Sequence, residues 1–136
     1  MAPAGENGGM NTPVNPSSIA PPAANYAHAV LVQQPSAWLY TSGVVPTAPD
    51  GSTPEGIDAQ AELVWSNIGA MLAEAGMSTA DVVSITTYAV AGQPLAGVMA
   101  ARDRAMGDTR AASTLVTVPA LARPEWLMEI AIVAAR

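Results

Sequence analysis

The feature that most constrains the fold is a segment with helical periodicity, residues 58–75 (DAQAELVWSNIGAMLAEA). Its apolar residues recur at steps of three and four, which predicts a helix with one buried face. That face is formed by Ala61, Val64, Ile68, Met71, Leu72 and Ala75. Asp58 stands near the helix start, where a carboxylate interacts favourably with the helix dipole. Gly76 follows the last turn and predicts a C-cap there.

Runs of β-branched and apolar residues surround this helix and predict strands. The predicted strands are 27–33, 38–46, 82–91, 112–118 and 126–134. A second helix is expected over 95–106, opened by Pro94 and ended by Gly107. The short linkage at 34–36 predicts a hairpin between the first two strands. The order β-β-α-β-α-β-β predicts an α+β fold, a two-layer sandwich of strands and helices.

The length of 136 residues fits one domain, which we expect to cover residues 25–136. Residues 1–24 are rich in Pro, Gly, Asn and Ser and form a separate N-terminal segment. Composition predicts a flexible tail over residues 1–12 and an extended segment from Val14 onward.

Charge and composition exclude several classes of function. The net charge is −6 and all five basic residues are arginines, so a footprint for nucleic acid or anionic membrane is missing. There is no cysteine and His28 is the only histidine, so neither a metal nor a disulfide is expected. No secretory signal or bilayer-length apolar run is present, which predicts a cytoplasmic protein. Only 12% of residues are charged, which is a hint of a surface covered in an oligomer.

A few polar side chains stand out from this background. Glu129 lies inside an apolar strand, where a carboxylate is exposed at an edge, paired, or functional. His28 is either a general base or a packed or surface residue. Ser42 and Gly43 stand where a strand ends, and their N–H groups either face a ligand or begin a turn. The group 102–104 (RDR) on the second helix is interpreted as a solvated face.

Six stretches, taken in order, resemble the reactive intermediate deaminase family, also called Rid or YjgF. They are NYAHAV (25–30), LYTSGVVP (39–46), IDAQAELVWSNIGAMLAEAG (57–76), DVVSITTYAV (81–90), ASTLVTVPAL (112–121) and WLMEIAIVA (126–134). The resemblance covers about residues 14–135. It implies a homotrimer of chorismate-mutase-like subunits with small-molecule clefts between neighbouring chains. It also implies hydrolysis of imines and enamines such as 2-aminoacrylate to ammonia and a 2-oxo acid, without a cofactor.

The resemblance assigns roles to individual residues of this chain. Tyr26 matches a cleft tyrosine, and Ser42 and Gly43 match the Ser-Gly that borders the ligand. Glu129 matches the glutamate that holds the hydrolytic water, if the preceding loop has one extra residue. Ser113 stands where deaminating members have an arginine, whose planar guanidinium grips the substrate carboxylate at two points.

At two further positions, apolar residues of this chain stand where the family has polar ones. The cleft asparagine of the family corresponds to Met99, and a cysteine or threonine corresponds to Leu115. Arg110, three residues before Ser113, is a candidate replacement for the missing arginine, although a loop residue holds a ligand less rigidly. Serine cannot supply a charged clamp, so we expect a poor 2-aminoacrylate deaminase.

Three functions therefore remain open at this point. The first is an enzyme that hydrolyses an imine, enamine or related electrophile with Glu129. The second is a non-catalytic trimer that binds a small metabolite in the same cleft. The third is RNA cleavage, which some family members are said to perform and which the acidic charge of this chain disfavours.

Overall fold

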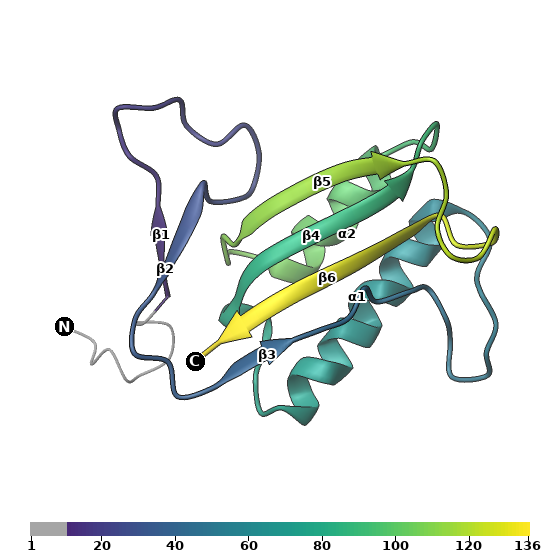
Figure 1. The fold of residues 1–136 in the computed structure, drawn as a ribbon, viewed down its shortest axis with the longest axis horizontal. Helices are drawn as coiled ribbons and strands as arrows, with labels where there is room; N and C mark the ends of the chain where they lie inside the picture. The colour runs from purple at the N-terminus through teal and green to yellow at the C-terminus, as the bar shows by residue number, and fades with distance from the viewer. Residues whose placement is uncertain (1–10) are drawn as a thin grey trace.

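A computed structural model of the chain describes residues 11–136. Along the chain lie β1 (Asn11–Val14), β2 (Ala29–Val32), β3 (Trp38–Tyr40), α1 (Ile57–Glu74), β4 (Val82–Val90), α2 (Ala96–Met106), β5 (Ala112–Val118) and β6 (Met128–Ala135). A short 3-10 turn, Thr79–Asp81, precedes β4. Both helices cover one face of a twisted sheet, and the opposite face is open (Figure 1). The predicted α+β sandwich is therefore confirmed.

The main sheet has four strands in the order β3-β6-β4-β5. β4 and β5 run parallel and are joined through α2, whereas β6 is antiparallel to both β4 and β3. β5 is thus an edge strand. The register pairs Ile85 with Ser113, and it pairs Tyr88 with Glu129. Partners in a register share one face of the sheet, so these pairs fix where each side chain points.

The buried layer between helices and sheet is built largely as the periodicity of α1 predicts. Ala61, Val64, Ile68 and Leu72 are buried, and they pack against alternate residues of β4 and β6. Met71 and Ala75, expected on the same face, are exposed instead, and the buried face turns toward Gln60 and Trp65. Gly76 and Gly107 follow the helices with positive φ angles, as predicted. Among the described residues, neither helix combines the length and hydropathy needed to span a membrane.

The N-terminal part departs from expectation. β2 pairs with β1 in a separate two-stranded sheet, which stands beside the main sheet in Figure 1, so the predicted hairpin of β2 with the next strand is wrong. The chain bends at Gln34, which has a φ of 48°, and the N–H groups of Ser36 and Ala37 then donate to the carbonyl of Arg136. β3 consequently pairs with β6. A flexible tail was expected over residues 1–12. Residues 1–10 lie outside the described part of the chain, whereas Asn11 and Thr12 belong to β1.

The predicted strand 38–46 is also shorter in the structure. Regular pairing ends at Tyr40, and contact with β6 resumes at an isolated bridge between Val44 and Ile130. Thr41 still donates to the carbonyl of Ile132 at 3.1 Å, and the N–H of Val44 donates to the carbonyl of Ile130 at 2.7 Å. The chain therefore leaves the ladder only between these two bonds, at residues 42–43.

Candidate functional site

Glu129 lies against the interrupted segment between β3 and α1. A Cβ built on Gly43 would overlap the carboxylate oxygen Oε2 of Glu129 and would lie 2.9 Å from its Cδ. The glutamate therefore occupies the space that any other residue at position 43 would need. The close approach of Gly43 and Glu129, which the resemblance implies only indirectly, is a direct contact within one protomer.

Glu129 lies on the face of the sheet that the helices leave open. It alternates with the core residues Met128 and Ile130, so its side chain faces the open side of the sheet. There it shares a row with Tyr88 and Val116. Glu129 is half-buried and takes part in none of the three ion pairs of residues 11–136. A carboxylate without a cation beside it is free to accept hydrogen bonds from a water or ligand.

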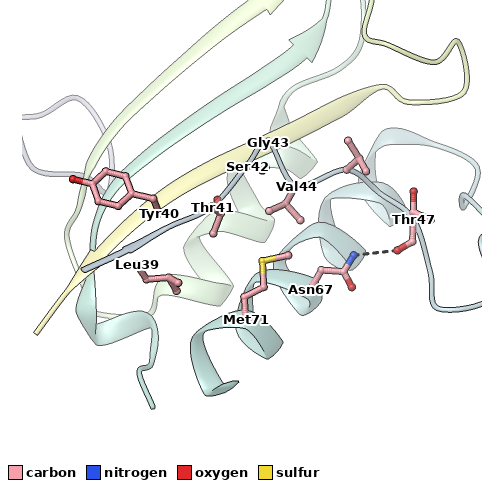
Figure 2. Close-up of a pocket in the computed structure, with 10 residues that line it drawn as sticks. Leu39, Tyr40, Thr41, Ser42, Gly43, Val44, Thr47, Asn67 and Met71 are labelled. Carbon is pink, nitrogen blue, oxygen red and sulfur yellow. Dashed lines mark hydrogen bonds between the residues drawn. The ribbon is translucent and has the colours of Figure 1, made fainter. Parts of the chain in front are cut away.

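A pocket opens on the other side of the same loop, between β3 and α1. Figure 2 shows the side chains of Thr41, Val44 and Met71 around it, with Ser42 and Gly43 at its rim. Asn67 is held beside it by a hydrogen bond from Nδ2 to the carbonyl of Thr47 at 3.1 Å. Neither Glu129 nor Ser113 lines this pocket. Gly43 thus borders both this pocket and the glutamate, whereas Ser42, which is exposed, is shown only at the pocket.

A second polar cluster lies where α2 meets the beginning of β5. Arg102 donates from Nε and Nη2 to Oδ1 of Asp103, at 3.2 and 3.0 Å. Nη1 of Arg102 donates to Oγ of Ser113 at 3.4 Å. Asn25 donates from Nδ2 to the other oxygen of Asp103 at 3.1 Å. This Arg102 cluster (Asn25, Arg102, Asp103 and Ser113) joins the helix, the edge strand and the segment before β2.

The two groups lie on opposite faces of the sheet. Ser113 pairs with the core residue Ile85 and so faces the helices, whereas Glu129 faces the open side. Leu115, two residues along, shares the face of Ser113 and is half-buried. Within one protomer Ser113 and Glu129 therefore do not meet. A common cleft that contains both requires two subunits, and it stays a prediction.

The remaining predicted site residues are distributed between these groups. Tyr26 directly follows Asn25 of the Arg102 cluster, and Ala27 is bridged to Ala112 at the edge of β5. The Tyr26 hydroxyl accepts from the N–H of Ala23 at 3.2 Å. His28 is exposed, with Nε2 2.6 Å from the carbonyl of Ala20. Tyr26 thus belongs to the Ser113 side of the protomer.

Arg110 is occupied by its own loop. Its Nη1 donates to the carbonyls of Gly107 and Thr109, at 2.8 and 3.4 Å. These bonds tie the guanidinium to the end of α2. Whether Arg110 binds a ligand stays a prediction, but in this geometry it would first have to leave both carbonyls.

Arg102 is the residue that the sequence analysis missed, because its helix segment was interpreted as solvated. The interpretation is wrong for Arg102, which is buried, and holds for Arg104, which is exposed and paired with Glu62. A signal was present in the sequence. Arg102 lies four residues after Val98 and four before Met106, both buried, so helical spacing places it on the apolar face of α2.

The four-stranded sheet with both helices on one face defines an α+β protein of the chorismate-mutase-like class. A family model described as Endoribonuclease L-PSP matches residues 17–136. The chain therefore belongs to this family, which is the Rid or YjgF family of the resemblance.

Individual relatives agree with this assignment. The Rid-family protein YyfB of Yersinia pestis has 32% sequence identity and a TM-score of 0.83 over 93% of this chain and 99% of that chain. The structure of yeast Mmf1 has 26% identity and a TM-score of 0.68 over 92% of this chain and 98% of that chain. In sequence, the mitochondrial protein MMF1 of Saccharomyces cerevisiae is 32% identical over 78 residues, which is 57% of this chain and 52% of that protein. The sequence match thus spans about half of that relative's length.

Proposed function

We propose that this chain hydrolyses imines and enamines of small metabolites in a cleft between subunits, with Glu129 as the catalytic residue. The observation that carries the proposal is the half-buried carboxylate of Glu129, unpaired among the ion pairs of residues 11–136 and packed against Gly43. A half-buried carboxylate with no cation beside it has lost part of its hydration, which a bound water or ligand can replace. Binding and activating a water molecule is a purpose that suits its chemistry.

The reaction needs only a positioned base that can also act as an acid. An enamine first tautomerises to the imine. Water then adds to the C=N carbon while Glu129 accepts a proton from the water and passes it to the nitrogen. Collapse of the carbinolamine breaks the C–N bond, which releases ammonia and leaves the carbonyl compound. Neither metal nor cofactor takes part in this scheme.

Ser113 sets the expected preference for substrate. If the cleft is formed as in the resemblance, Ser113 replaces the two-pronged arginine with a single hydroxyl, and Met99 and Leu115 make its surroundings less polar. The proposed enzyme is therefore a weak 2-aminoacrylate deaminase, because the carboxylate of that substrate loses a charge-assisted clamp.

The open face of the sheet supports the proposed homotrimer. Tyr40 is 70% exposed and Val116 is 39% exposed, and both lie on the side of the sheet without helices. A sheet face with apolar and aromatic residues is normally covered. Sedimentation at several protein concentrations tests this, with a trimer expected. Val116→Asp should shift the protein toward the monomer, whereas a compact wild-type monomer contradicts the proposal.

Activity is tested by generating imines in place with an amino-acid oxidase and trapping what remains with semicarbazide. The expected result is less trapped imine with wild type, and a loss of about 100-fold or more in Glu129→Gln, which keeps the size but not the base. Glu125→Gln removes an exposed carboxylate and is the matched control. Ligand binding without turnover of any imine would instead assign the chain to the alternative function, a non-catalytic metabolite-binding trimer.

A further inference from the structure

Ser113 carries no charge, but the cation Arg102 lies directly beside it. Arg102 has a side chain that is 7% exposed, whereas those of Arg104 and Arg123 are 63% and 66% exposed. Arg110 and Arg136 are bound to backbone carbonyls near the ends of α2 and α1. Among the five arginines, Arg102 is thus the one buried cation, and its Nη1 lies 3.4 Å from Ser113 Oγ.

Burial of this guanidinium is costly and incompletely compensated. Its neighbours along the apolar face of α2 are Val98 and Met106, and an apolar residue would pack between them without desolvating a charge. Asp103 supplies the single ion-pair partner found among the described residues, and its side chain is 37% exposed. A buried arginine with one partly solvated partner suggests a role beyond packing.

The hydrogen bonds of this buried guanidinium leave Nη1 with only a weak acceptor. Asp103 holds Nε and Nη2 through one oxygen, and Asn25 holds the second oxygen of Asp103. The planar group is therefore fixed in orientation with Nη1 directed at the hydroxyl of Ser113. The long, weak contact of Nη1 with Ser113 leaves donor capacity for a stronger acceptor.

We propose that Arg102 binds the carboxylate of a small 2-oxo or 2-imino acid, together with the hydroxyl of Ser113. The cation is supplied by α2, whereas the arginine implied by the resemblance would be supplied by β5. This inference rests on the proposed function for the position of the cleft, but it concerns binding and does not require turnover. Asp103 shares the charge and occupies two of the three nitrogens, so Arg102 offers one nitrogen where a free guanidinium offers a fork. Carboxylates are bound, but more weakly than by an unshared arginine, as the weak deamination proposed above requires.

Binding of pyruvate and of its uncharged analogue pyruvamide to the full chain, followed by NMR titration, tests the inference. Arg102→Gln should weaken pyruvate binding by about tenfold or more and leave pyruvamide nearly unchanged, because only pyruvate presents a carboxylate. Asp103→Asn keeps the acceptor to Arg102 but removes its charge, and should tighten pyruvate binding several-fold. Arg104→Gln makes the same charge change on an exposed position of α2 and should have no effect.

A second pair of variants avoids removal of the buried arginine. Ser113→Asp places a carboxylate within reach of Nη1 and should abolish pyruvate binding as an internal competitor, whereas the neutral Ser113→Asn, which only removes the hydroxyl, should weaken it far less. Pyruvate binding that is undetectable in wild type, or equal in wild type and Arg102→Gln, would overturn the inference. Failure of the proposed function has a different signature, in which pyruvate binds through Arg102 but no imine is hydrolysed.

Discussion

The carboxylate of Glu129 and the α-carbon of Gly43 are in contact at the interruption between β3 and the bridge at Val44. A methyl group on Gly43 would overlap Oε2 of Glu129. Gly43 has no positive φ angle, so its backbone conformation is open to other residues. The requirement for glycine at this position therefore comes from the glutamate and not from the turn.

This contact predicts the effect of Gly43→Ala. The added methyl group should displace the Glu129 carboxylate, and imine hydrolysis should fall by about 100-fold, because a catalytic group displaced by about 1 Å loses its alignment. The fold should survive, since the backbone needs no change. The oxidase-coupled assay and a thermal melt measure the two effects separately.

Gly69→Ala provides the control for that substitution. Gly69 lies on the exposed side of α1, with no atom within 4 Å of an added Cβ. Alanine there should stabilise the protein by about 0.5–1 kcal/mol through helix propensity and leave activity unchanged. Full activity in Gly43→Ala would show that the observed position of Glu129 does not matter for catalysis.

The Arg102 cluster changes what Ser113→Arg is expected to do. In the wild type, Oγ of Ser113 is 3.4 Å from Nη1 of Arg102. An arginine at position 113 would therefore lie beside Arg102, and two cations would compete for Asp103. We expect the free energy of unfolding to fall by about 1–3 kcal/mol, as for an uncompensated partly buried charge. The double variant Arg102→Gln with Ser113→Arg should recover most of this loss. Urea titrations at one protein concentration measure both.

The same pair of variants reports on activity. If a strand arginine is the better clamp, the double variant should hydrolyse 2-aminoacrylate faster than wild type, because its guanidinium can bind the carboxylate at two points. Equal stability of the single and double variants would contradict the proximity of the two side chains. The stability of Ser113→Arg should be measured before its activity, because an unfolded variant would be inactive for reasons unrelated to the clamp.

The sequence predicts the layers of this fold better than its N-terminal pairing. Helical periodicity located α1 to within one residue at each end, because a helix is specified by contacts three and four residues apart. The partner of β2 could not be predicted, since pairing depends on distant contacts such as those of Ser36 and Ala37 with the C-terminal carbonyl. Strand patterns are compatible with several neighbours.

For the candidate site, the sequence singles out the residues of interest but does not predict which face of the sheet each side chain lies on. Glu129 stands out because a carboxylate interrupts an apolar run. Its separation from Ser113 depends on the register of β4 with both neighbours, which alternation within single strands does not give. Arg102 was missed because charged neighbours at 103 and 104 obscured the spacing of Val98 and Met106.

The loop before α1 provides a pH-dependent prediction. Hydrogen bonds from the hydroxyl of Ser52, at 2.6 Å, and then from its N–H lower the pKa of Asp50 below its ordinary value of 3.8. A lowered pKa in the folded state means that Asp50 stabilises the fold above the unfolded-state pKa and loses this contribution as pH falls through the folded value. The difference in stability between wild type and Ser52→Ala should thus be present at pH 6 and shrink as the pH falls below 3.8.

An NMR titration of the Asp50 carboxyl carbon checks the cause directly. Its midpoint should lie below 3.8 in wild type and move upward in Ser52→Ala. Asp50 is fully exposed, so only the direction is predicted and the effect is expected to be small. An unchanged midpoint in Ser52→Ala would remove the Ser52 hydroxyl as the cause.

Gln60 should be a major source of stability because it joins two loops across the buried end of α1. Its amide is 1% exposed and donates to the carbonyls of Pro54 and Glu125, at 3.0 and 2.9 Å. Its Oε1 accepts the N–H of Leu127 at 2.8 Å, two residues before Glu129. Gln60→Leu keeps the volume but leaves three backbone groups without their partner, and should cost about 2–4 kcal/mol in the free energy of unfolding.

Two comparisons separate the hydrogen bonds from the packing. Gln60→Glu retains the acceptor for Leu127 but places a carboxylate oxygen against two carbonyls, so it should destabilise at least as much as leucine at neutral pH. Gln33→Leu, at an exposed position after β2, should change stability by less than about 0.5 kcal/mol. Urea unfolding at a fixed protein concentration gives all three values. If Gln60→Leu were as stable as wild type, the amide would not hold the loop, and the placement of Glu129 would have to depend on Gly43 and the β6 ladder alone.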